Sequence, residues 1–233
     1  GTYDNPWRSL NSYFDDGCMT DSKLDPGDIV YVHDGVDSPS WTARGLNGTT
    51  EDPVTAVVYP NSRSTTTDGS IGFYGGEASY INVAKFSVIS NGTGVGMNPF
   101  GRVIANSITD NTCADGQSGA ISGSNLNVPT VDGNVALGNY IFNWGGPCTT
   151  SLHHVFYISN RGGTPVRAFE LGWNYIIDAE ANGGLHIYDE GVCGDYTGTI
   201  KVHDNVVINQ AGPAFGASAG LGGTDCISAP IDV

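Results

Sequence analysis

Basic side chains are scarce in this chain. Of its 233 residues only 9 are Lys or Arg, against 24 Asp and Glu, so the formal net charge is −15. Nucleic acids are bound largely through contacts between basic side chains and phosphates, and this balance argues against such a partner. A polyanionic substrate would likewise need Ca²⁺ or a local basic groove to offset the repulsion.

Long apolar runs are also absent. No stretch approaches the roughly 18 apolar residues of a membrane-spanning helix, and no signal-peptide pattern stands at the start. The chain begins with Gly1 rather than Met, as a processed product does. We therefore expect a secreted, extracellular protein without a membrane span.

What the chain does contain is glycine, at 34 residues, together with 39% apolar residues. The apolar content suffices for a core, so the excess of Gly, Ser, Thr and Asn does not indicate disorder. It predicts many short strands separated by tight turns.

Five segments of the sequence align without gaps. They are "VAKFSVIS" from Val83, "VIANSITD" from Val103, "ALGNYIFN" from Ala136, "LGWNYIID" from Leu171 and "VHDNVVIN" from Val202. Their fourth residues are Phe86, Asn106, Asn139, Asn174 and Asn205. The intervals between these positions fall in the range of about 20 to 50 residues that is typical of solenoids and propellers, and short strands broken by Gly and Asn favour the coils of a parallel β-helix.

The recurring Asn predicts a ladder. In a β-helix successive coils stack about 4.8 Å apart, so an Asn at the same bend of each coil can hydrogen-bond to its copies above and below. The residues two places after each Asn should then stack as an inward aliphatic column: Ile108, Ile141, Ile176 and Val207.

A second strand precedes the ladder at a constant offset, marked by Ile121, Phe156 and Ile187, which each stand equally far before their own ladder Asn. We expect these three side chains to stack inward. By strand alternation Tyr157 and Tyr188 should point outward together, as should Val155 and His186.

The same register applies to the cysteines, which show no CxxC pair and so no zinc cluster. Two pairs fall on the same side of adjacent coils and predict the disulfides Cys113–Cys148 and Cys193–Cys226. Cys18 is left over, either free or joined to another chain. An oxidising compartment is favoured.

The two ends of the chain differ from the repeats. Residues 1–26 are predicted to form a cap with a short helix over Trp7–Phe14, and residues 27–233 the β-helix. At the other end "APIDV" from Ala229 is typical of the start of another strand. We expect the C-terminal coil to be covered by another polypeptide, either a continuation of a longer chain or the next subunit in head-to-tail self-association.

These residues resemble the pectin-lyase-like superfamily of right-handed parallel β-helices. The resemblance is carried by "NPWRSL…LDPGDIVYVHDG", the Asn-centred repeats and "HHVFYIS…GLHIYDE", and it covers nearly the whole chain. It implies an all-β, right-handed parallel β-helix (a solenoid). Relatives of this kind are mostly secreted carbohydrate-active proteins, so it also implies a polysaccharide partner.

One candidate site follows from the register of the strands before the ladder. Arg102, Val135, Glu170 and Lys201 should occupy one outward column, with His203 two residues after Lys201. A lyase acting on a uronate must neutralise the sugar carboxylate and remove a carbon-bound proton, and these residues could provide the base. The alternative is a surface ion pair. Trp173, beside the ladder, is predicted either to stack on sugar or to pack against a loop.

A second candidate site lies on the other strand set. His186 and Tyr188 are candidate catalytic residues, and substrate contacts are expected from Tyr157, Arg161, Arg167 and Glu190. Asp189, Glu190 and Asp195 could hold Ca²⁺. Asp189 and Glu190 are consecutive, so on a continuing strand they would face opposite ways, which weakens a paired-carboxylate mechanism.

Two hypotheses of function follow. The first is a secreted carbohydrate-active protein that binds polysaccharide or cleaves it as a lyase. The second is a structural subunit that stacks end to end into an extracellular filament or surface appendage.

Overall fold

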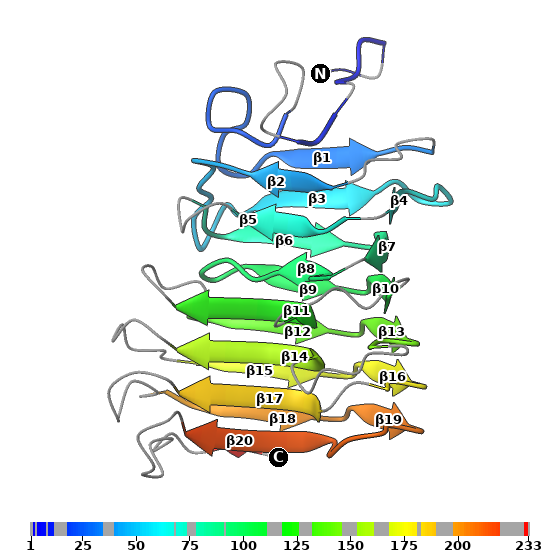
Figure 1. The fold of residues 1–233 in the computed structure, drawn as a ribbon. Helices are drawn as coiled ribbons and strands as arrows, with labels where there is room; N and C mark the ends of the chain where they lie inside the picture. The colour runs from blue at the N-terminus through cyan, green and yellow to red at the C-terminus, as the bar shows by residue number, and fades with distance from the viewer. Residues whose placement is uncertain are drawn as a thin grey trace.

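The computed structural model describes residues 2, 4–7, 9–11, 18–34, 40–67, 69–73, 78–90, 92–110, 118–125, 132–145, 153–160, 168–180, 183–189, 198–219 and 231–232. Within these residues every regular element is a β-strand and every paired neighbour is parallel. The strands form three sheets that extend along the molecule (Figure 1).

The eight-stranded sheet runs through the whole stack. In spatial order it consists of β1 (Ile29–Val32), β3 (Val54–Val58), β6 (Ile81–Ala84), β9 (Arg102–Ile104), β12 (Asn134–Leu137), β15 (Phe169–Gly172), β18 (Ile200–His203) and β21 (Ile231–Asp232).

The six-stranded sheet follows the eight-stranded sheet along the chain. From the N-terminal end it consists of β4 (Thr65–Thr67), β7 (Ser87–Ser90), β10 (Ser107–Asp110), β13 (Tyr140–Phe142), β16 (Tyr175–Ile177) and β19 (Val206–Ile208).

The seven-stranded sheet completes each circuit. It consists of β2 (Trp41–Ala43), β5 (Ile71–Phe73), β8 (Val95–Gly96), β11 (Ser118–Asn125), β14 (His153–Asn160), β17 (Gly183–Asp189) and β20 (Phe215–Ala219).

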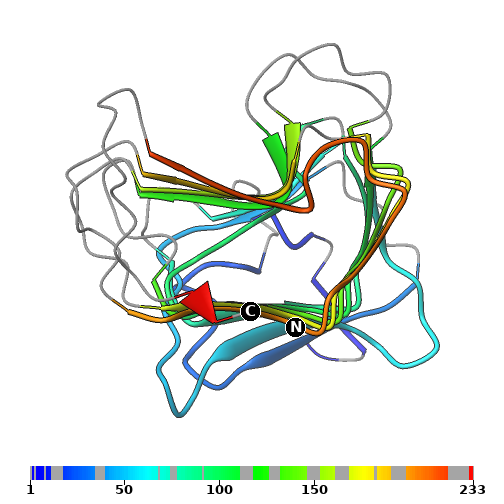
Figure 2. The same cartoon turned by 90° about the horizontal axis from the view of Figure 1, so that it is seen from below.

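The chain visits the three sheets in turn, and we call one such passage a coil. Each strand pairs with the corresponding strand of the next coil, and the strands superpose when the stack is viewed along its length (Figure 2). The arrangement is consistent with a parallel β-helix. No helix among the described residues could span a membrane.

A tight corner connects the eight-stranded sheet to the six-stranded sheet in five successive coils. At each corner one residue has a left-handed backbone, with φ between 51° and 66°: Lys85, Ala105, Gly138, Trp173 and Asp204. The next residue is Phe86 or an Asn of the repeat. The aligned segments of the sequence are therefore the same strand–corner–strand unit in five coils.

The predicted asparagine ladder is confirmed. The backbone N–H of Asn106 and its Nδ2 donate to Asn139 Oδ1 at 3.0 and 3.1 Å. Asn139 donates in the same way to Asn174, and Asn174 to Asn205, at 2.9–3.0 Å. The buried amides are thus satisfied by their own copies, which explains why a poor strand former stands here.

The aliphatic column beside the ladder is confirmed as well. Ile108 pairs with Ile141, which pairs with Ile176, which pairs with Val207. The first three are buried in the core, and Val207 is partly buried against it.

The predicted N-terminal helix is wrong. Trp7, Ser9, Leu10 and Asn11 are not helical, while residues 8 and 12–14 lie outside the described part. The carbonyl groups of Ser9 and Leu10 accept hydrogen bonds from the N–H groups of Cys18 and Met19, not from residues four places ahead. The segment therefore uses its backbone groups on a more distant partner, which is incompatible with a helix.

The N-terminal segment nevertheless contributes side chains to the core. Leu10, Cys18, Met19 and Leu24 are buried in the same apolar cluster as the strands, and the segment lies across the N-terminal end of the stack (Figures 1 and 2). Cys18 is unpaired, as predicted. Its burial raises the pKa of the thiol to about 11, so it is neither exposed nor a thiolate at neutral pH.

Candidate functional sites

The outward column predicted on the eight-stranded sheet is confirmed by the strand register. Arg102 pairs with Val135, Val135 with Glu170, and Glu170 with Lys201. His203, at the end of β18, pairs with Gly172. A Cβ placed on Gly172 would lie only 2.5 Å from the His203 ring, so the glycine is what lets this imidazole lie against β15.

His203 lies between two carboxylates. Its Nε2 is 3.0 Å from Glu170 Oε1 and its Nδ1 is 3.0 Å from Asp204 Oδ2. The hydrogen bonds to Asp204 and to Glu170 raise the pKa of His203, because both favour the protonated ring. The site can therefore present a cationic imidazole with two bound carboxylates at mildly acidic pH.

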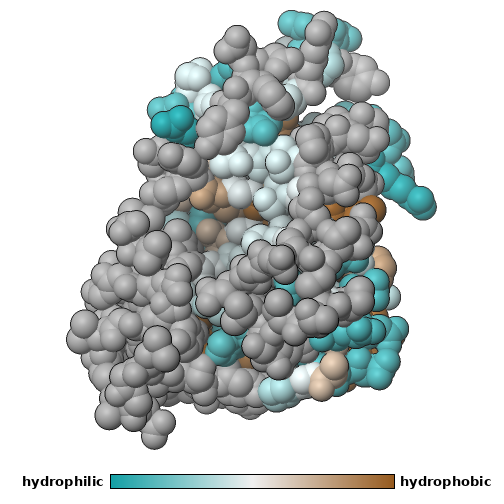
Figure 3. Space-filling view, viewed as in Figure 1, coloured by the Kyte–Doolittle hydropathy of each residue, from teal (hydrophilic) through white to brown (hydrophobic). Residues whose placement is uncertain are grey.

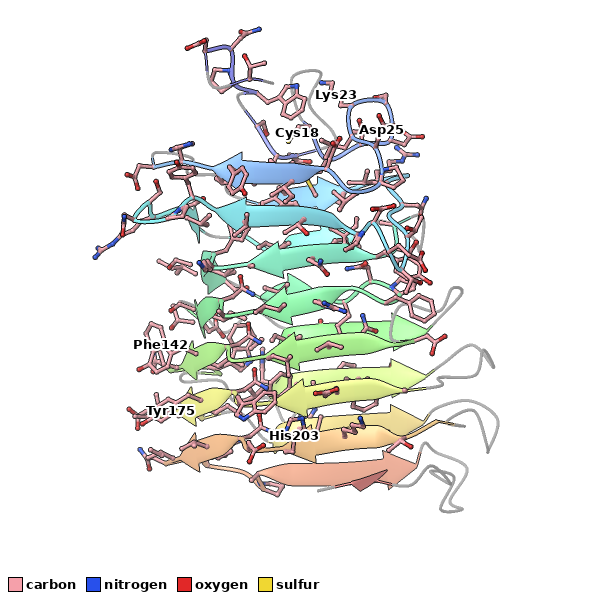
Figure 4. All side chains as sticks on the ribbon, turned by 180° about the vertical axis from the view of Figure 1, so that it is seen from behind. Cys18, Lys23, Asp25, Phe142, Tyr175 and His203 are labelled. Carbon is pink, nitrogen blue, oxygen red and sulfur yellow. The ribbon has the colours of Figure 1, made fainter. Side chains whose placement is uncertain are left out.

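Trp173 stands beside this group. Its ring contacts His203 edge to face, with centroids 4.6 Å apart, and 58% of the residue is exposed. We call Glu170, Trp173, Lys201, His203 and Asp204 the Trp173 corner. In Figure 4 His203 lies on the side of the molecule that faces the viewer, where the strands of the eight-stranded sheet are seen.

Exposed aromatic rings continue from this corner onto the six-stranded sheet. Tyr140 and Tyr175 pair in register and stack with centroids 5.6 Å apart, and Phe142 stacks on Tyr140 at 5.2 Å. Phe142 and Tyr175 project from adjacent coils on the same side of the molecule (Figure 4). The sequence reasoning did not single out these rings, although the outward alternation after each ladder Asn could have found them.

The seven-stranded sheet carries a different cluster. His154 Nε2 and His186 Nδ1 are 2.9 Å apart, and the ring of Tyr157 lies 5.3 Å from that of His154 and 5.6 Å from that of His186. We call His154 and His186 the histidine pair. His154 is only 5% exposed, and its Nδ1 is buried without a hydrogen-bond partner.

Both imidazoles of the histidine pair are held neutral. Burial lowers the pKa of His154 to about 4, and the neighbouring His186 and His153 act in the same direction. Burial also lowers the pKa of His186. The contact at neutral pH is therefore an N–H···N hydrogen bond between two uncharged rings.

The strand register corrects one part of the sequence prediction on this sheet. Ile121 pairs with Phe156 as expected, but Phe156 pairs with Leu185, so Ile187 pairs with Ile158. Consequently Tyr157 lies beside His186 and not beside Tyr188, which pairs with Ser159.

Two outward-facing expectations for β14 also differ from the structure. Val155 is fully buried, so it does not share an exposed face with His186, and Tyr157 is 7% exposed.

Figure 3 shows how polar and apolar side chains are distributed on one face of the molecule. The described side chains are teal and pale near the N-terminal end, pale and brown in the middle coils, and largely teal again at the lower right.

Several predicted residues fall outside the described part of the chain. These are Arg161, Arg167, Glu190, Asp195 and the four cysteines of the predicted disulfides, Cys113, Cys148, Cys193 and Cys226. Tyr188 and Asp189 belong to β17, but their side chains are not described. Among the described residues no three His, Cys, Asp or Glu side chains converge on a possible metal position. The disulfides and the Ca²⁺ site therefore stay predictions.

The structure thus brings Glu170, Lys201 and His203 together, as the sequence predicted, and adds Trp173 and Asp204 to this group. It unites His186 and Tyr157 with His154, which the sequence reasoning missed. Comparison with family models, with curated proteins and with solved structures found no match. The two sites are accordingly argued from their own chemistry.

Proposed function

We propose that the protein is a secreted polysaccharide-binding protein and that the Trp173 corner contacts the sugar. The observation that carries this proposal is the place of Trp173 itself. A large indole ring is 58% exposed at a corner whose backbone is left-handed, with φ 53°.

The corner does not need a tryptophan. The same position in the preceding coil is Gly138, with φ 63°, and nothing lies within 4 Å of a Cβ placed there. A left-handed backbone costs a non-glycine residue about 1–2 kcal/mol. Trp173 therefore adds strain and exposed apolar surface, and its ring contacts His203 edge to face while most of the residue stays exposed. Such a combination is characteristic of functional positions.

The groups around the indole suit a sugar. A pyranose ring offers an apolar face that can stack on an aromatic ring, and hydroxyls that need hydrogen-bond partners. The His203 imidazole lies against the indole, and the carboxylates of Glu170 and Asp204 hydrogen-bond to that imidazole. Lys201 extends the column. Tyr140 and Tyr175 lengthen the aromatic surface along the stack.

The raised pKa of His203 favours binding over lyase-type cleavage at this corner. A general base must be unprotonated near neutral pH, and the two carboxylates favour the protonated ring. His203 is better suited to donate hydrogen bonds to substrate oxygens. Cleavage would need its base from elsewhere.

The test is the variant Trp173→Gly, which copies the preceding coil. It should fold at least as stably as the parent chain, because the corner strain is relieved, and lose most binding in affinity electrophoresis against neutral and acidic polysaccharides, with and without Ca²⁺. Tyr31→Ala removes an equally exposed aromatic ring near the N-terminal end and should keep binding. If Trp173→Gly and Tyr31→Ala retained polysaccharide binding equally, the proposed site would be refuted. An unsaturated product absorbing in the ultraviolet would establish lyase activity.

A second candidate function is a filament subunit. The inward-facing Val202 and Val207 are only partly buried, whereas their counterparts Leu171 and Ile176 one coil earlier are buried. This difference favours a cover over the C-terminal coil, which a second copy of the chain could provide. Light scattering and electron microscopy across a concentration series would show head-to-tail polymers, and a monomer at all concentrations would rule the filament out.

For the fold we propose the finer assignment that the resemblance implied, a right-handed parallel β-helix of the pectin-lyase-like kind. The five repeated corners, the four-membered ladder and the three parallel sheets support it.

A further inference from the structure

The histidine pair is the most unusual polar contact in the described core. We propose that it is a binding site for a divalent transition-metal ion, ligated by His154 Nε2 and His186 Nδ1. These two nitrogens face one another at 2.9 Å, from adjacent strands β14 and β17 that are fixed in parallel register. The site is separate from the Trp173 corner, so it does not depend on the proposed sugar binding.

The charge state of the rings suits a metal. Imidazole binds a metal through a nitrogen lone pair, so only the neutral form is a ligand, and protons normally compete for that lone pair. The N–H···N contact itself requires a lone pair on one of the two facing nitrogens, so at least one of the two rings is neutral in this arrangement. The net charge of −15 also raises the concentration of cations near the surface.

The spacing of the nitrogens points to a class of metal. Metal–imidazole bonds are about 2.0–2.1 Å long, so two such ligands at a right angle lie about 2.9 Å apart, and at a tetrahedral angle about 3.3–3.4 Å apart. The observed 2.9 Å matches neighbouring positions of a square-planar or octahedral ion. Among metals that favour imidazole this geometry selects Cu²⁺ or Ni²⁺ over Zn²⁺.

Metal binding replaces the hydrogen bond between the two imidazoles without a net change in the number of bound protons. Each neutral ring carries one N–H, and the N–H···N bond occupies His154 Nε2 and His186 Nδ1. In the N–H···N bond one of the two rings carries its proton on the contact nitrogen. When both contact nitrogens ligate the metal, that ring gives this proton to solvent and takes one up on its other nitrogen, so that His154 is protonated on Nδ1 and His186 on Nε2. No net proton is released, and one hydrogen bond is replaced by two metal–nitrogen bonds.

The remaining ligand positions fall to solvent or to oxygen donors, because no third His, Cys, Asp or Glu joins the pair in the described part of the chain. Two nitrogens alone do not suit Ca²⁺, which takes six to eight oxygen ligands. The inferred metal is therefore distinct from the Ca²⁺ predicted at Asp189, Glu190 and Asp195.

The experiment is a Cu²⁺ titration of the chelator-stripped full chain, followed by calorimetry and by electron paramagnetic resonance. We expect one bound ion with hyperfine coupling to two nitrogens, unaffected by a tenfold excess of Ca²⁺. His186→Ala and His154→Phe should each weaken binding by at least about tenfold and remove the two-nitrogen signal.

His203→Gln is the matched control, since it removes an imidazole from the other sheet, and it should leave the Cu²⁺ affinity unchanged. If His154→Phe does not fold, His186→Ala carries the test, because His186 is the more exposed ring. Equal Cu²⁺ affinity in the parent chain and His186→Ala would overturn the proposal and leave a simple N–H···N contact. Loss of binding in His203→Gln alone, or displacement by Ca²⁺, would overturn it too.

Discussion

The seven-stranded and eight-stranded sheets hold histidines in opposite surroundings. His154 is buried among uncharged rings, and burial lowers its pKa to about 4, while His203 is bonded to Asp204 and Glu170, which raise its pKa. The same side chain is therefore held in its uncharged form on one sheet, while on the other its protonated, hydrogen-bond-donating form is favoured. The scaffold is common to both, so the difference comes from desolvation against charge pairing.

The largest expected effect is a loss of stability when a ladder asparagine, which holds the coils of both sheets together, is replaced. Asn174→Leu removes the acceptor for Asn139 N–H and the donor to the Ala136 carbonyl, and each buried group left without a partner costs about 1–3 kcal/mol. Urea unfolding should show the loss. Asn82→Leu, which removes one partly buried bond to Thr55, should cost less. Equal midpoints for the parent chain and Asn174→Leu would contradict the ladder.

The next effect is the loss of stability at acid pH that the lowered pKa of His154 predicts. Unfolded His154 titrates near its ordinary pKa of 6.5 and folded His154 near 4, so the unfolded state takes up the proton first. The contribution of neutral His154 to the free energy of unfolding is therefore fully present above about pH 6.5. It is lost as the pH falls toward 4, and the loss is at most about 3 kcal/mol.

The measurement is a set of urea unfolding curves between pH 4 and 7.5 for the parent chain and His154→Leu. The difference between the two curves isolates His154 from the carboxylates that titrate in the same range. The parent should lose stability more steeply than the variant, and parallel curves would show that His154 is not held neutral by burial.

A smaller effect of opposite sign is expected at His203. Because its folded pKa is raised, its contribution is complete below the ordinary pKa and is lost as the pH rises through the folded value. Exposure of the side chain keeps the effect small. An NMR titration should place the midpoint of His203 above that of His154, with His203→Gln identifying the signal. A midpoint of His203 below that of His154 would contradict the opposite pKa shifts of the two histidines.

Much of the scaffold could be predicted because the sequence repeats at the corner. The ladder, the aliphatic column and the outward column through Glu170 and Lys201 all lie within a few residues of Asn174 or its copies. Short distances along the chain leave no room for loops to change the register, so counting from the Asn works.

Counting failed farther from the corner. Phe156 and Ile187 stand equally far before Asn174 and Asn205, but the true partner of Phe156 is Leu185. The reason is that ten residues separate β17 from β18, whereas eight separate β14 from β15. A shift by an even number of positions keeps side chains on the same face, which is why Ile187 is still buried as predicted while its partner is wrong.

The histidine pair could not be predicted from the alternation of inward and outward side chains along a strand. His154 shares strand parity with the buried Phe156, yet it contacts His186 and Tyr157, since the ladder pairing of β14 skips Val155 on both sides. Glycines at Gly119 and Gly183, which pair with His154, were the available signal for an irregular strand. The helix predicted at the N-terminus failed because local pattern cannot show the pairing of Ser9 and Leu10 with Cys18 and Met19.

The ladder ends at Phe86, and this limits how far the coils are coupled. Asn106 Oδ1 accepts the N–H of Phe86, but the Phe86 ring turns to Trp41, 5.8 Å away, and passes no hydrogen bond onward. Four coils are thus joined by a one-way chain of amides, while the coils before them are joined by their strands, by aromatic packing and by separate side-chain hydrogen bonds such as those of Asn82 to Thr55 and of Asn98 to Ile81. Unfolding should therefore proceed as in a chain of nearest neighbours with one weak link, the N-terminal coils opening as one block and the amide-linked coils as another.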